Sequence, residues 1–245
     1  MKSYETLIEM GRHLEKSEET LCLLGLGSMA DTKRLDQYSD IDFFLIVKDG
    51  YKKKYLYDLS WMNQTIIYSF MNTKDGYKVL FDNDVFAEFA VFESFELEQI
   101  PFDKGKVIFA KEGFDLNLIQ PKEKHIQPLD VSYNINEALT NLYIGLSREK
   151  RGEKASAFSY IQVYAVSLVM PLFAKLYDEK NIAIDPFSYE RRIEFRHNEA
   201  VALLAEFKQG YLKNKESAQA ILEFLNTHFD INQPFYKKIM HLIEN

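Results

Sequence analysis

Residues 26–28 read LGS and, after a polar loop, residues 40–47 read DIDFFLIV. An apolar run leads into the Gly-Ser pair, and a second apolar run follows the two acids. Both runs have the length and composition of buried strands. Alternate residues of a strand point to the same face, so we expect Asp40 and Asp42 to project side by side. The stretch therefore predicts two strands, with a carboxylate pair where the second one starts.

Further strand and helix patterns surround this pair. A helical pattern covers 4–18, and segment 52–62 is ambiguous, with a helix packed on the sheet as one interpretation. Asn72 to Gly76 reads as a hairpin turn with Asp75-Gly76 as its tight element. The runs of strand type are 20–27, 41–48, 64–71, 77–82, 84–93 and 106–110. The first half of the chain is thus predicted to form a sheet with flanking helices.

The second half reads as helical throughout. A polar, proline-bounded connector from Gln120 to Pro128 separates it from the sheet, and Pro171 should kink or divide the longest helical segment. The predicted helices are 131–150, 153–178, 187–210, 215–227 and 232–243, with a loop from Asn181 to Pro186. The predicted class is α+β, with a domain built on a mixed sheet with flanking helices over 1–122 and a helical bundle domain over 123–245.

Composition narrows the classes of function. The chain has 245 residues, 47% hydrophobic and 27% charged, which is typical of a globular protein. A net charge of −7 argues against a general nucleic-acid coat, which needs clustered cations. The one cysteine, Cys22, lies in an apolar run, so neither an internal disulfide nor a cysteine metal cluster is expected. The N-terminus lacks a signal-peptide pattern and no run of about 18 apolar residues occurs, so we expect a cytoplasmic protein without a membrane partner.

Three acids are the candidate metal ligands. Asp40 and Asp42 share a strand face with apolar residues, and buried carboxylates are costly unless something compensates their charge. Oxygen ligands without His or Cys suit Mg²⁺ or Mn²⁺. Glu88, on the apolar strand 84–93, is the best third acid, with a buried ion-pair partner as its alternative role. Gly27 and Ser28 add a turn where a phosphate could approach the backbone closely.

These residues resemble a known family. A Gly-Ser pair, an Asp-x-Asp about a dozen residues later and an acid on a later strand resemble the nucleotidyltransferase superfamily with the DNA polymerase beta-like fold. The string DQYSDIDF at 36–43 looks more specifically like the lincosamide nucleotidyltransferases of the Lin(B) type. FDN at 81–83, EF at 88–89 and KRGE at 150–153 are similar too. In that subfamily the second acid of the pair can be Glu, where this chain has Asp42.

The resemblance implies an activity and roles for its residues. A nucleoside monophosphate would pass from an Mg²⁺-bound nucleoside triphosphate to a hydroxyl of a small molecule, such as a lincosamide or aminoglycoside antibiotic, and pyrophosphate would leave. Asp40 and Asp42 would hold two metal ions, and Glu88 would be a third ligand or the general base. Gly27 and Ser28 would bind the outer phosphates. Cations from the helical half would neutralise pyrophosphate, and the candidates are Lys150, Arg151 and Lys154.

Several alternatives stay open at this point. Lys150 and Arg151 could equally be an ordinary helix end that complements the helix dipole. A related enzyme could modify a protein or an RNA end, and a binding module could keep the fold without catalysis. A homodimer is also an open alternative. A further basic cluster, Arg191, Arg192, Arg196 and His197, is interleaved with glutamates and predicts a solvated, salt-bridged helix face.

Overall fold

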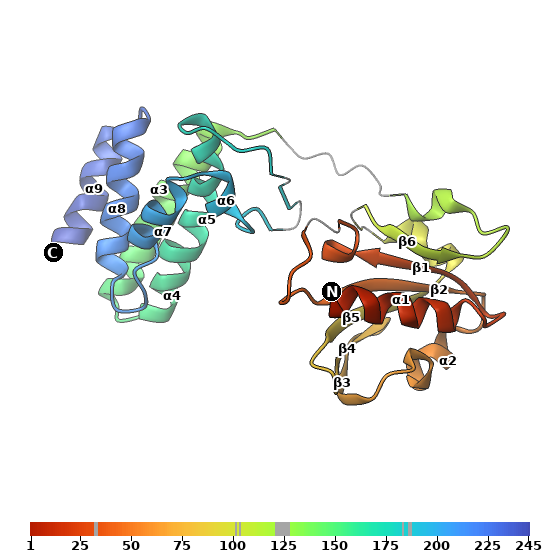
Figure 1. Cartoon of the computed structure of the whole chain (residues 1–245). Coiled ribbons are helices and arrows are strands. Elements are labelled where there is room, and N and C mark those ends of the chain that lie inside the picture. Colours follow the sequence, from red (N-terminus) through yellow and green to blue (C-terminus); the bar gives the residue numbers. More distant parts are fainter. Residues whose placement is uncertain (32–33, 101, 103, 121–127, 183, 186–187) are drawn as a thin grey trace. The chain divides into compact units, whose positions relative to one another are not determined.

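The chain forms two compact units, Met1–Glu123 and Lys124–Asn245. The computed structural model describes residues 1–31, 34–100, 102, 104–120, 128–182, 184–185 and 188–245 (Figure 1). The predicted boundary between 122 and 123, most of the connector around it, and parts of the predicted loop 181–186 lie outside the described residues.

The first unit is built on a mixed six-stranded sheet with the order β3-β4-β5-β2-β1-β6. The strands are β1 (Thr20–Leu26), β2 (Ile41–Val47), β3 (Ile66–Thr73), β4 (Gly76–Phe81), β5 (Phe86–Glu93) and β6 (Lys106–Ala110). β2 and β5 are parallel, and the other neighbouring strands are antiparallel. Each strand lies within a few residues of a predicted run, so the predicted α+β class is confirmed.

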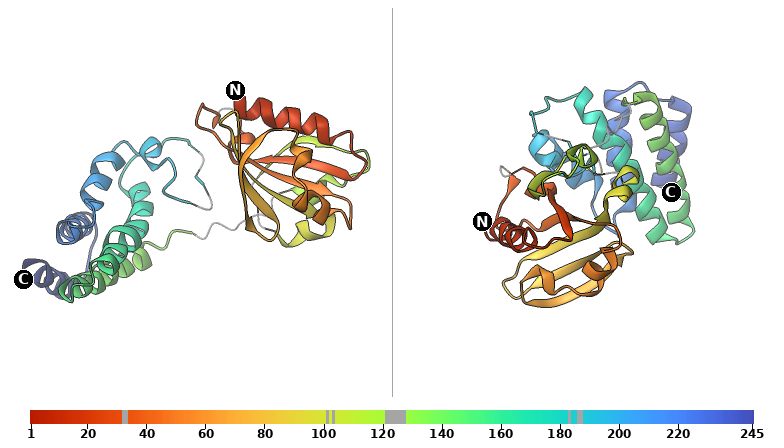
Figure 2. Two further views of the ribbon diagram at one scale, coloured as in Figure 1. Left: turned by 90° about the horizontal axis from the view of Figure 1, so that it is seen from below. Right: turned by 90° about the vertical axis from the view of Figure 1, so that its right-hand side faces the viewer.

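One face of the sheet is covered by helices. α1 (Lys2–Leu14) lies along this face, as Figure 2 shows, and α2 (Lys52–Tyr57) with the 3₁₀ turn Ser60–Met62 packs beside it. Leu7 and Met10 of α1 and Trp61 of the turn are buried against the strand residues of this face. On β2 these are the odd-numbered residues 41, 43, 45 and 47. The ambiguous segment 52–62 is thus a short helix followed by a 3₁₀ turn.

The opposite face carries the even-numbered residues of β2. Toward the C-terminal end of β2, Ile46 joins a smaller core with Phe92 of β5 and Leu24 of β1. Leu97 and Ile119, from 3₁₀ turns that follow β5 and β6, complete this core. The acids fall at the other end of the same face, where β2 begins. This face is therefore apolar at one end of the strands and acidic at the other.

The second unit is helical. Its long helices are α3 (Val131–Lys150), α8 (Asn214–His228) and α9 (Gln233–Glu244). Shorter helices are α4 (Lys154–Phe158), α5 (Val166–Val169), α6 (Ile193–Arg196) and α7 (Ala200–Phe207). Leu139 and Leu142 of α3, Ile221 of α8 and Ile239 of α9 are fully buried in its core. The predicted helical half is confirmed, although the predicted helix 187–210 is two short helices where it is described.

Segment Lys154–Lys175 departs from a simple helix. A π-helical stretch, Ser159–Ala165, separates α4 from α5, and a 3₁₀ turn starts at Met170, beside Pro171. The predicted break at Pro171 is thus confirmed, because its ring cannot continue the preceding helix. By length and composition alone this segment could cross a membrane, but half of its most apolar window is buried inside the unit. Buried core helices give the same signal, so this is weak support for a membrane span.

The hairpin between β3 and β4 corrects one prediction. Lys74 and Asp75 occupy the turn, whereas Gly76 already belongs to β4 and pairs with Thr73. A β-carbon at position 76 would lie 1.9 Å from the carbonyl oxygen of Phe89. The glycine is therefore required by the close approach of β5 rather than by the geometry of the turn.

The basic cluster of the helical unit corrects another prediction. Arg196 and His197 are fully buried, although a solvated face was predicted. Arg196 Nη1 lies 3.0 Å from Glu179 Oε1, its guanidinium stacks over the Tyr189 ring at 4.2 Å, and it also donates to the Tyr189 carbonyl. Arg191, in contrast, is exposed and lies 3.0 Å from Asp185 Oδ2, as predicted for a salt-bridged face. Only Arg196 and His197 belong to the core, and charge alternation in the sequence did not reveal this.

Candidate active site

The strand register brings two of the predicted acids together. Asp42 of β2 and Glu88 of β5 are direct neighbours across the parallel ladder. The same transverse row continues to Lys78 of β4 and Phe70 of β3 on one side and to Leu26 of β1 on the other. Residues opposite one another in neighbouring strands project from the same face. The row therefore presents an aromatic ring, a cation and two carboxylates on a single face of the sheet.

Gly27 fits closely against Asp42. It follows β1 with φ at +53°, a conformation that L side chains rarely adopt. A β-carbon on Gly27 would lie 2.7 Å from Asp42 Oδ2, closer than such atoms approach. Ser28 Oγ donates to the backbone oxygen of Asp40 at 3.4 Å, so the turn also contacts the residue before β2. The Gly-Ser turn therefore lies against the start of β2, where the acid pair is.

Glu88 has protein partners on both carboxylate oxygens. Asn72 Nδ2 donates to Glu88 Oε1 at 2.7 Å, and Lys78 Nζ lies 3.2 Å from Glu88 Oε2. The side chains of Lys78 and Glu88 are 36% and 42% exposed, so the pair is accessible to a ligand. Lys78 accordingly supplies the ion-pair partner that the sequence left open as an alternative for Glu88. A carboxylate has about four lone-pair positions, so Glu88 keeps capacity to accept a further proton.

The acids fit a metal only in part. Among the described residues, no group of three His, Cys, Asp or Glu side chains is close enough to hold a metal ion. Asp40 and Asp42 have the oxygen donors that Mg²⁺ prefers and lie one residue apart at the start of β2. Asn72 and Lys78 contact the two oxygens of Glu88, and its role as a third ligand or as the base stays a prediction. The metal role of the aspartate pair stays a prediction as well.

The three predicted cations lie in the helical unit, where α3 ends and α4 begins. The pKa of Lys150 is lowered, chiefly by a hydrogen bond with Lys215 and then by burial and the charge of Lys215. Arg151 Nη1 lies 3.9 Å from Glu153 Oε1, and Lys154 Nζ lies 4.0 Å from Glu149 Oε1. Acids thus partly balance Arg151 and Lys154, whereas the neighbour of Lys150 is another cation. The role of all three cations at phosphate stays a prediction.

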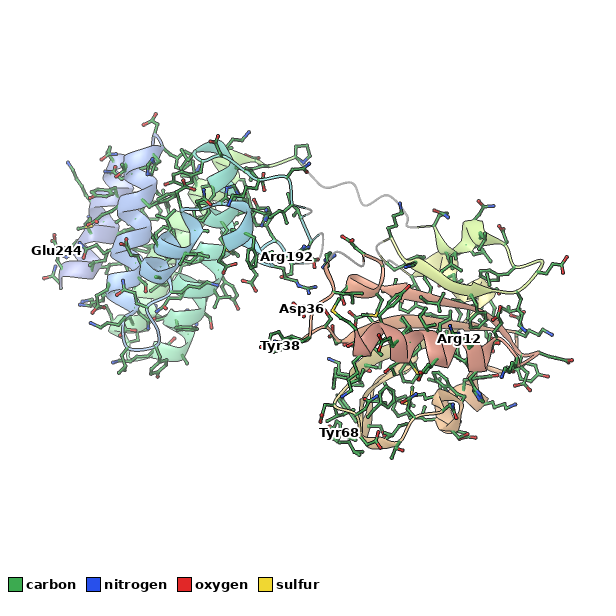
Figure 3. All side chains as sticks on the ribbon, viewed as in Figure 1. Arg12, Asp36, Tyr38, Tyr68, Arg192 and Glu244 are labelled. Atoms are coloured by element: carbon green, nitrogen blue, oxygen red, sulfur yellow. The ribbon has the colours of Figure 1, made fainter. Side chains whose placement is uncertain are left out.

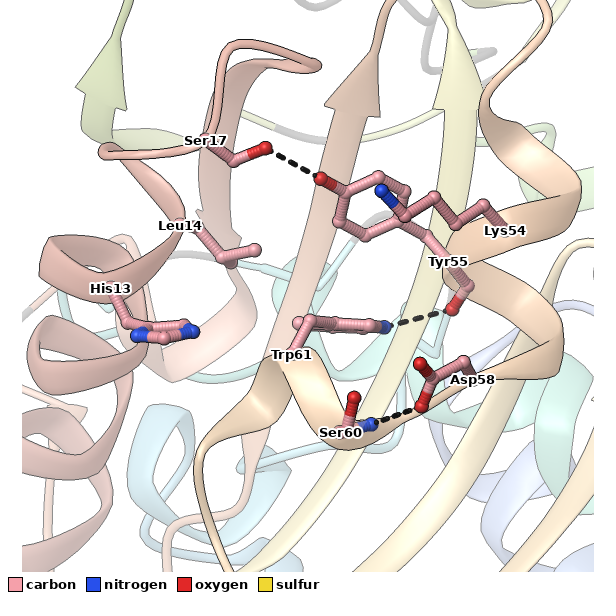
Figure 4. A pocket seen from close by; sticks show the side chains of 8 residues that line it. All are labelled: His13, Leu14, Ser17, Lys54, Tyr55, Asp58, Ser60 and Trp61. Atoms are coloured by element: carbon pink, nitrogen blue, oxygen red, sulfur yellow. Dashed lines mark hydrogen bonds between the residues drawn. The ribbon is translucent and has the colours of Figure 1, made fainter.

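A pocket of about 260 Å³ lies elsewhere, on the helix-covered face of the sheet (Figure 4). The C-terminal part of α1 and the segment from α2 to the 3₁₀ turn form it. Tyr55 and Trp61 make its apolar floor, and Trp61 Nε1 donates to the Tyr55 carbonyl at 2.8 Å. None of the predicted site residues lines this pocket. It is separate from the acidic row on the other face.

Asn72 and Lys78 were not singled out from the sequence. Both come from the β3–β4 hairpin; Asn72 lies at the register shift between Met71 and Thr73, and its side chain donates to Glu88 of β5. Asn72 Oδ1 is buried and has no hydrogen-bond partner. The one signal available in the sequence was a lysine inside an otherwise apolar strand run. That signal does not identify Glu88 as the partner, because strand order is a tertiary property.

The chain matches no protein-family model and no curated protein. Solved structures overlap it only loosely. An aminoglycoside 6-adenyltransferase from Bacillus subtilis has 12% identity and a TM-score of 0.35, over 100% of this chain and 92% of that one. A nucleotidyltransferase-like protein from Exiguobacterium sibiricum has 10% identity and a TM-score of 0.34, over 99% and 74%. A STING-associated c-di-GMP synthase from Capnocytophaga granulosa has 12% identity and a TM-score of 0.31, over 99% and 77%. Such low scores establish neither a common fold nor a common activity.

Proposed function

We propose that the protein is a metal-dependent nucleotidyltransferase that moves a nucleoside monophosphate from a nucleoside triphosphate to a hydroxyl of a small molecule. The observation that supports this most is the convergence of Gly27, Asp42 and Glu88. A glycine turn at positive φ, a carboxylate and a second acid meet on one face of the sheet, at the end where β2 begins. A fold without such chemistry has little reason to keep these groups together, because like charges on adjacent strands repel.

The roles follow from the positions. Asp40 and Asp42 would hold Mg²⁺, or Mn²⁺, together with oxygens of the triphosphate. Bound metal would supply charge neutralisation at the phosphates and would lower the pKa of the acceptor hydroxyl. The backbone beside Gly27 and the hydroxyl of Ser28 would contact the outer phosphates, since glycine permits close approach.

Glu88 would act as the general base. The acceptor oxygen attacks the α-phosphorus, the bond from that phosphorus to the bridging oxygen breaks, and pyrophosphate leaves with the electron pair. The proton of the acceptor hydroxyl passes to Glu88. Asn72 and Lys78 would hold the carboxylate in position while it keeps free lone pairs. Two ions at the aspartates and a small hydroxylated acceptor, such as a lincosamide or an aminoglycoside, remain part of this proposal.

The test is nucleotidyl transfer with the full chain. The protein is incubated with Mg²⁺, ATP or GTP labelled at the α-phosphate, and lincomycin or kanamycin as acceptors. We expect pyrophosphate release that requires the acceptor, and label on the acceptor. Label on the protein or on an added polypeptide would instead support a protein-modifying enzyme. Absence of nucleotide binding with Mg²⁺ by calorimetry would overturn the proposal and leave a non-catalytic module.

A further inference from the structure

The strand β3 is an edge strand of unusual composition. It forms one end of the sheet and carries no charged residue from Ile66 to Thr73. β6, at the other end, is shorter and starts with Lys106. Soluble proteins commonly protect their edge strands with short length or charge, because an open strand edge offers unpaired N–H and C=O groups to another strand. By these criteria β6 is protected and β3 is not.

Apolar side chains are exposed on both faces of β3. Tyr68 and Phe70 are 53% and 45% exposed, and Ile67 and Met71 are 59% and 41% exposed. Figure 3 shows Tyr68 projecting at the periphery of the first unit. By their register with β4, Tyr68 and Phe70 lie on the face of Glu88, and Met71 lies on the helix-covered face; Ile67 falls at the register shift before Tyr68. A ligand bound to one face would contact only the apolar residues of that face. A strand paired at the edge would instead place side chains beside those on both faces.

The exposed residues are arranged symmetrically about Ser69. If a second copy of β3 pairs antiparallel with Ser69 opposite Ser69, Tyr68 faces Phe70 of the other copy, and Met71 lies beside the segment that contains Ile67. Aromatic residues then meet aromatic residues on the face of Glu88. The run from Tyr68 to Met71 keeps regular register with β4, between two register shifts. Because the strand carries no charge, this pairing brings no like charges together.

We propose that β3 is a homodimer interface, in which two copies of this chain join their sheets edge to edge through antiparallel β3 strands centred on Ser69. Such an interface is isologous, so it closes after two copies and does not propagate. Because paired residues point to the same side, the acidic rows of both copies face the same side of the joined sheet. This inference rests on β3 alone and does not depend on the proposed nucleotidyl transfer.

The exposed apolar area of β3 sets the expected affinity of the dimer. Half of an aromatic side chain corresponds to about 100 Å² of surface, so the four exposed side chains offer on the order of 400 Å² per copy. A standard-size interface buries about 800 Å² per partner. Main-chain hydrogen bonds between the two strands add to this smaller contact. We therefore expect a reversible dimer with a dissociation constant roughly in the micromolar range.

A cross-linking variant tests the register. Ser69→Cys places two thiols opposite one another at the symmetry axis, where the α-carbons of paired strands lie about 4.5–5.5 Å apart, within disulfide range. Cys22 is buried and does not compete. Thr73→Cys is the matched control, because in this register residue 73 is opposite residue 65 of the other copy. We expect rapid disulfide-linked dimer from Ser69→Cys under mild oxidation and little from Thr73→Cys.

A charge pair tests the same contact without a covalent bond. Ser69→Lys and Ser69→Glu each bring like charges together at the axis, so each variant alone should sediment as a monomer. Their equimolar mixture should form a heterodimer, while wild-type protein shows a concentration-dependent monomer–dimer equilibrium. Ser69 is exposed, so circular dichroism should show both variants folded. Wild-type protein that remains monomeric at high concentration, or equal cross-linking of the two cysteine variants, would overturn the proposal.

Discussion

Asp42 and Glu88 stand directly opposite one another on the parallel strands β2 and β5. Adjacent residues on neighbouring strands lie close enough for their charges to interact, so each carboxylate needs a compensating group. Asn72 and Lys78 contact the carboxylate of Glu88, and Gly27 lies against the carboxylate of Asp42. We propose a metal role for Asp42 because it lies one residue from Asp40 at the start of β2, and a base role for Glu88.

Replacing Asp42 tests the metal role. Asp42→Asn is nearly isosteric, but its amide is a poor metal ligand, so we expect nucleotidyl transfer to fall by about 100-fold or more. The fold should be retained, as judged by circular dichroism. Asp49→Asn, at an exposed position after β2, is the matched control and should keep full turnover. Near-normal turnover of Asp42→Asn would contradict the metal role.

Replacing Gly27 tests the close contact between the glycine turn and the Asp42 carboxylate. Gly27→Ala must place a methyl group 2.7 Å from Asp42 Oδ2 while keeping a positive φ. Gly50→Ala meets the same backbone strain, but nothing lies within 4 Å of its β-carbon. Both variants should lose about 1–2 kcal/mol of unfolding free energy in urea titrations. Turnover should fall by about 100-fold in Gly27→Ala alone, because the carboxylate is displaced.

Replacing Lys78 tests whether it positions Glu88. Lys78→Met keeps the length of the side chain and removes the charge that lies 3.2 Å from Glu88 Oε2. We expect kcat to fall by about tenfold while KM for the nucleotide is unchanged, since the base loses orientation but the phosphate contacts remain. Stability should change by less than about 1 kcal/mol, because the pair is partly exposed. Lys53→Met, on the exposed side of α2, is the control; a rise in nucleotide KM would point instead to a phosphate contact of Lys78.

Replacing Glu179 tests the buried ion pair of the helical unit. Glu179→Gln leaves the fully buried Arg196 guanidinium without the carboxylate 3.0 Å away. We expect a loss of about 3 kcal/mol in unfolding free energy, because an uncompensated buried charge is costly. Glu190→Gln removes an exposed partner of Lys208 and should change stability by less than about 0.5 kcal/mol. Equal effects in denaturant titrations would contradict a structural role for the Arg196 pair.

Cys22 gives a probe of unfolding. Burial raises the pKa of its thiol from about 9 to about 12, since the thiolate is disfavoured away from water. Folded protein should therefore react slowly with iodoacetamide at pH 8 and rapidly in denaturant. The raised pKa means that the folded state keeps its proton longer than the unfolded state. This contribution to stability is present below about pH 9 and is lost as the pH rises toward 12, which melting curves can check.

Much of the fold could be predicted from sequence because its signals are local. Strand runs, the helical second half and the break at Pro171 follow from short-range periodicity and from backbone rules. The residue types of the candidate active site could be recognised for the same reason. Gly27-Ser28 and Asp40-Ile41-Asp42 are short strings, and an acid such as Glu88 is conspicuous in an apolar strand.

Strand order and burial were decided only by the tertiary structure. Nothing local in β4 or β3 shows that Lys78 and Asn72 reach Glu88, because that contact requires β4 to pair with β5. The burial of Arg196 likewise depends on Glu179 and Tyr189 being brought to it by the packing of the helical unit. Local patterns thus specify which residue types and elements are present. Their partners were determined by long-range packing, which no local pattern encodes.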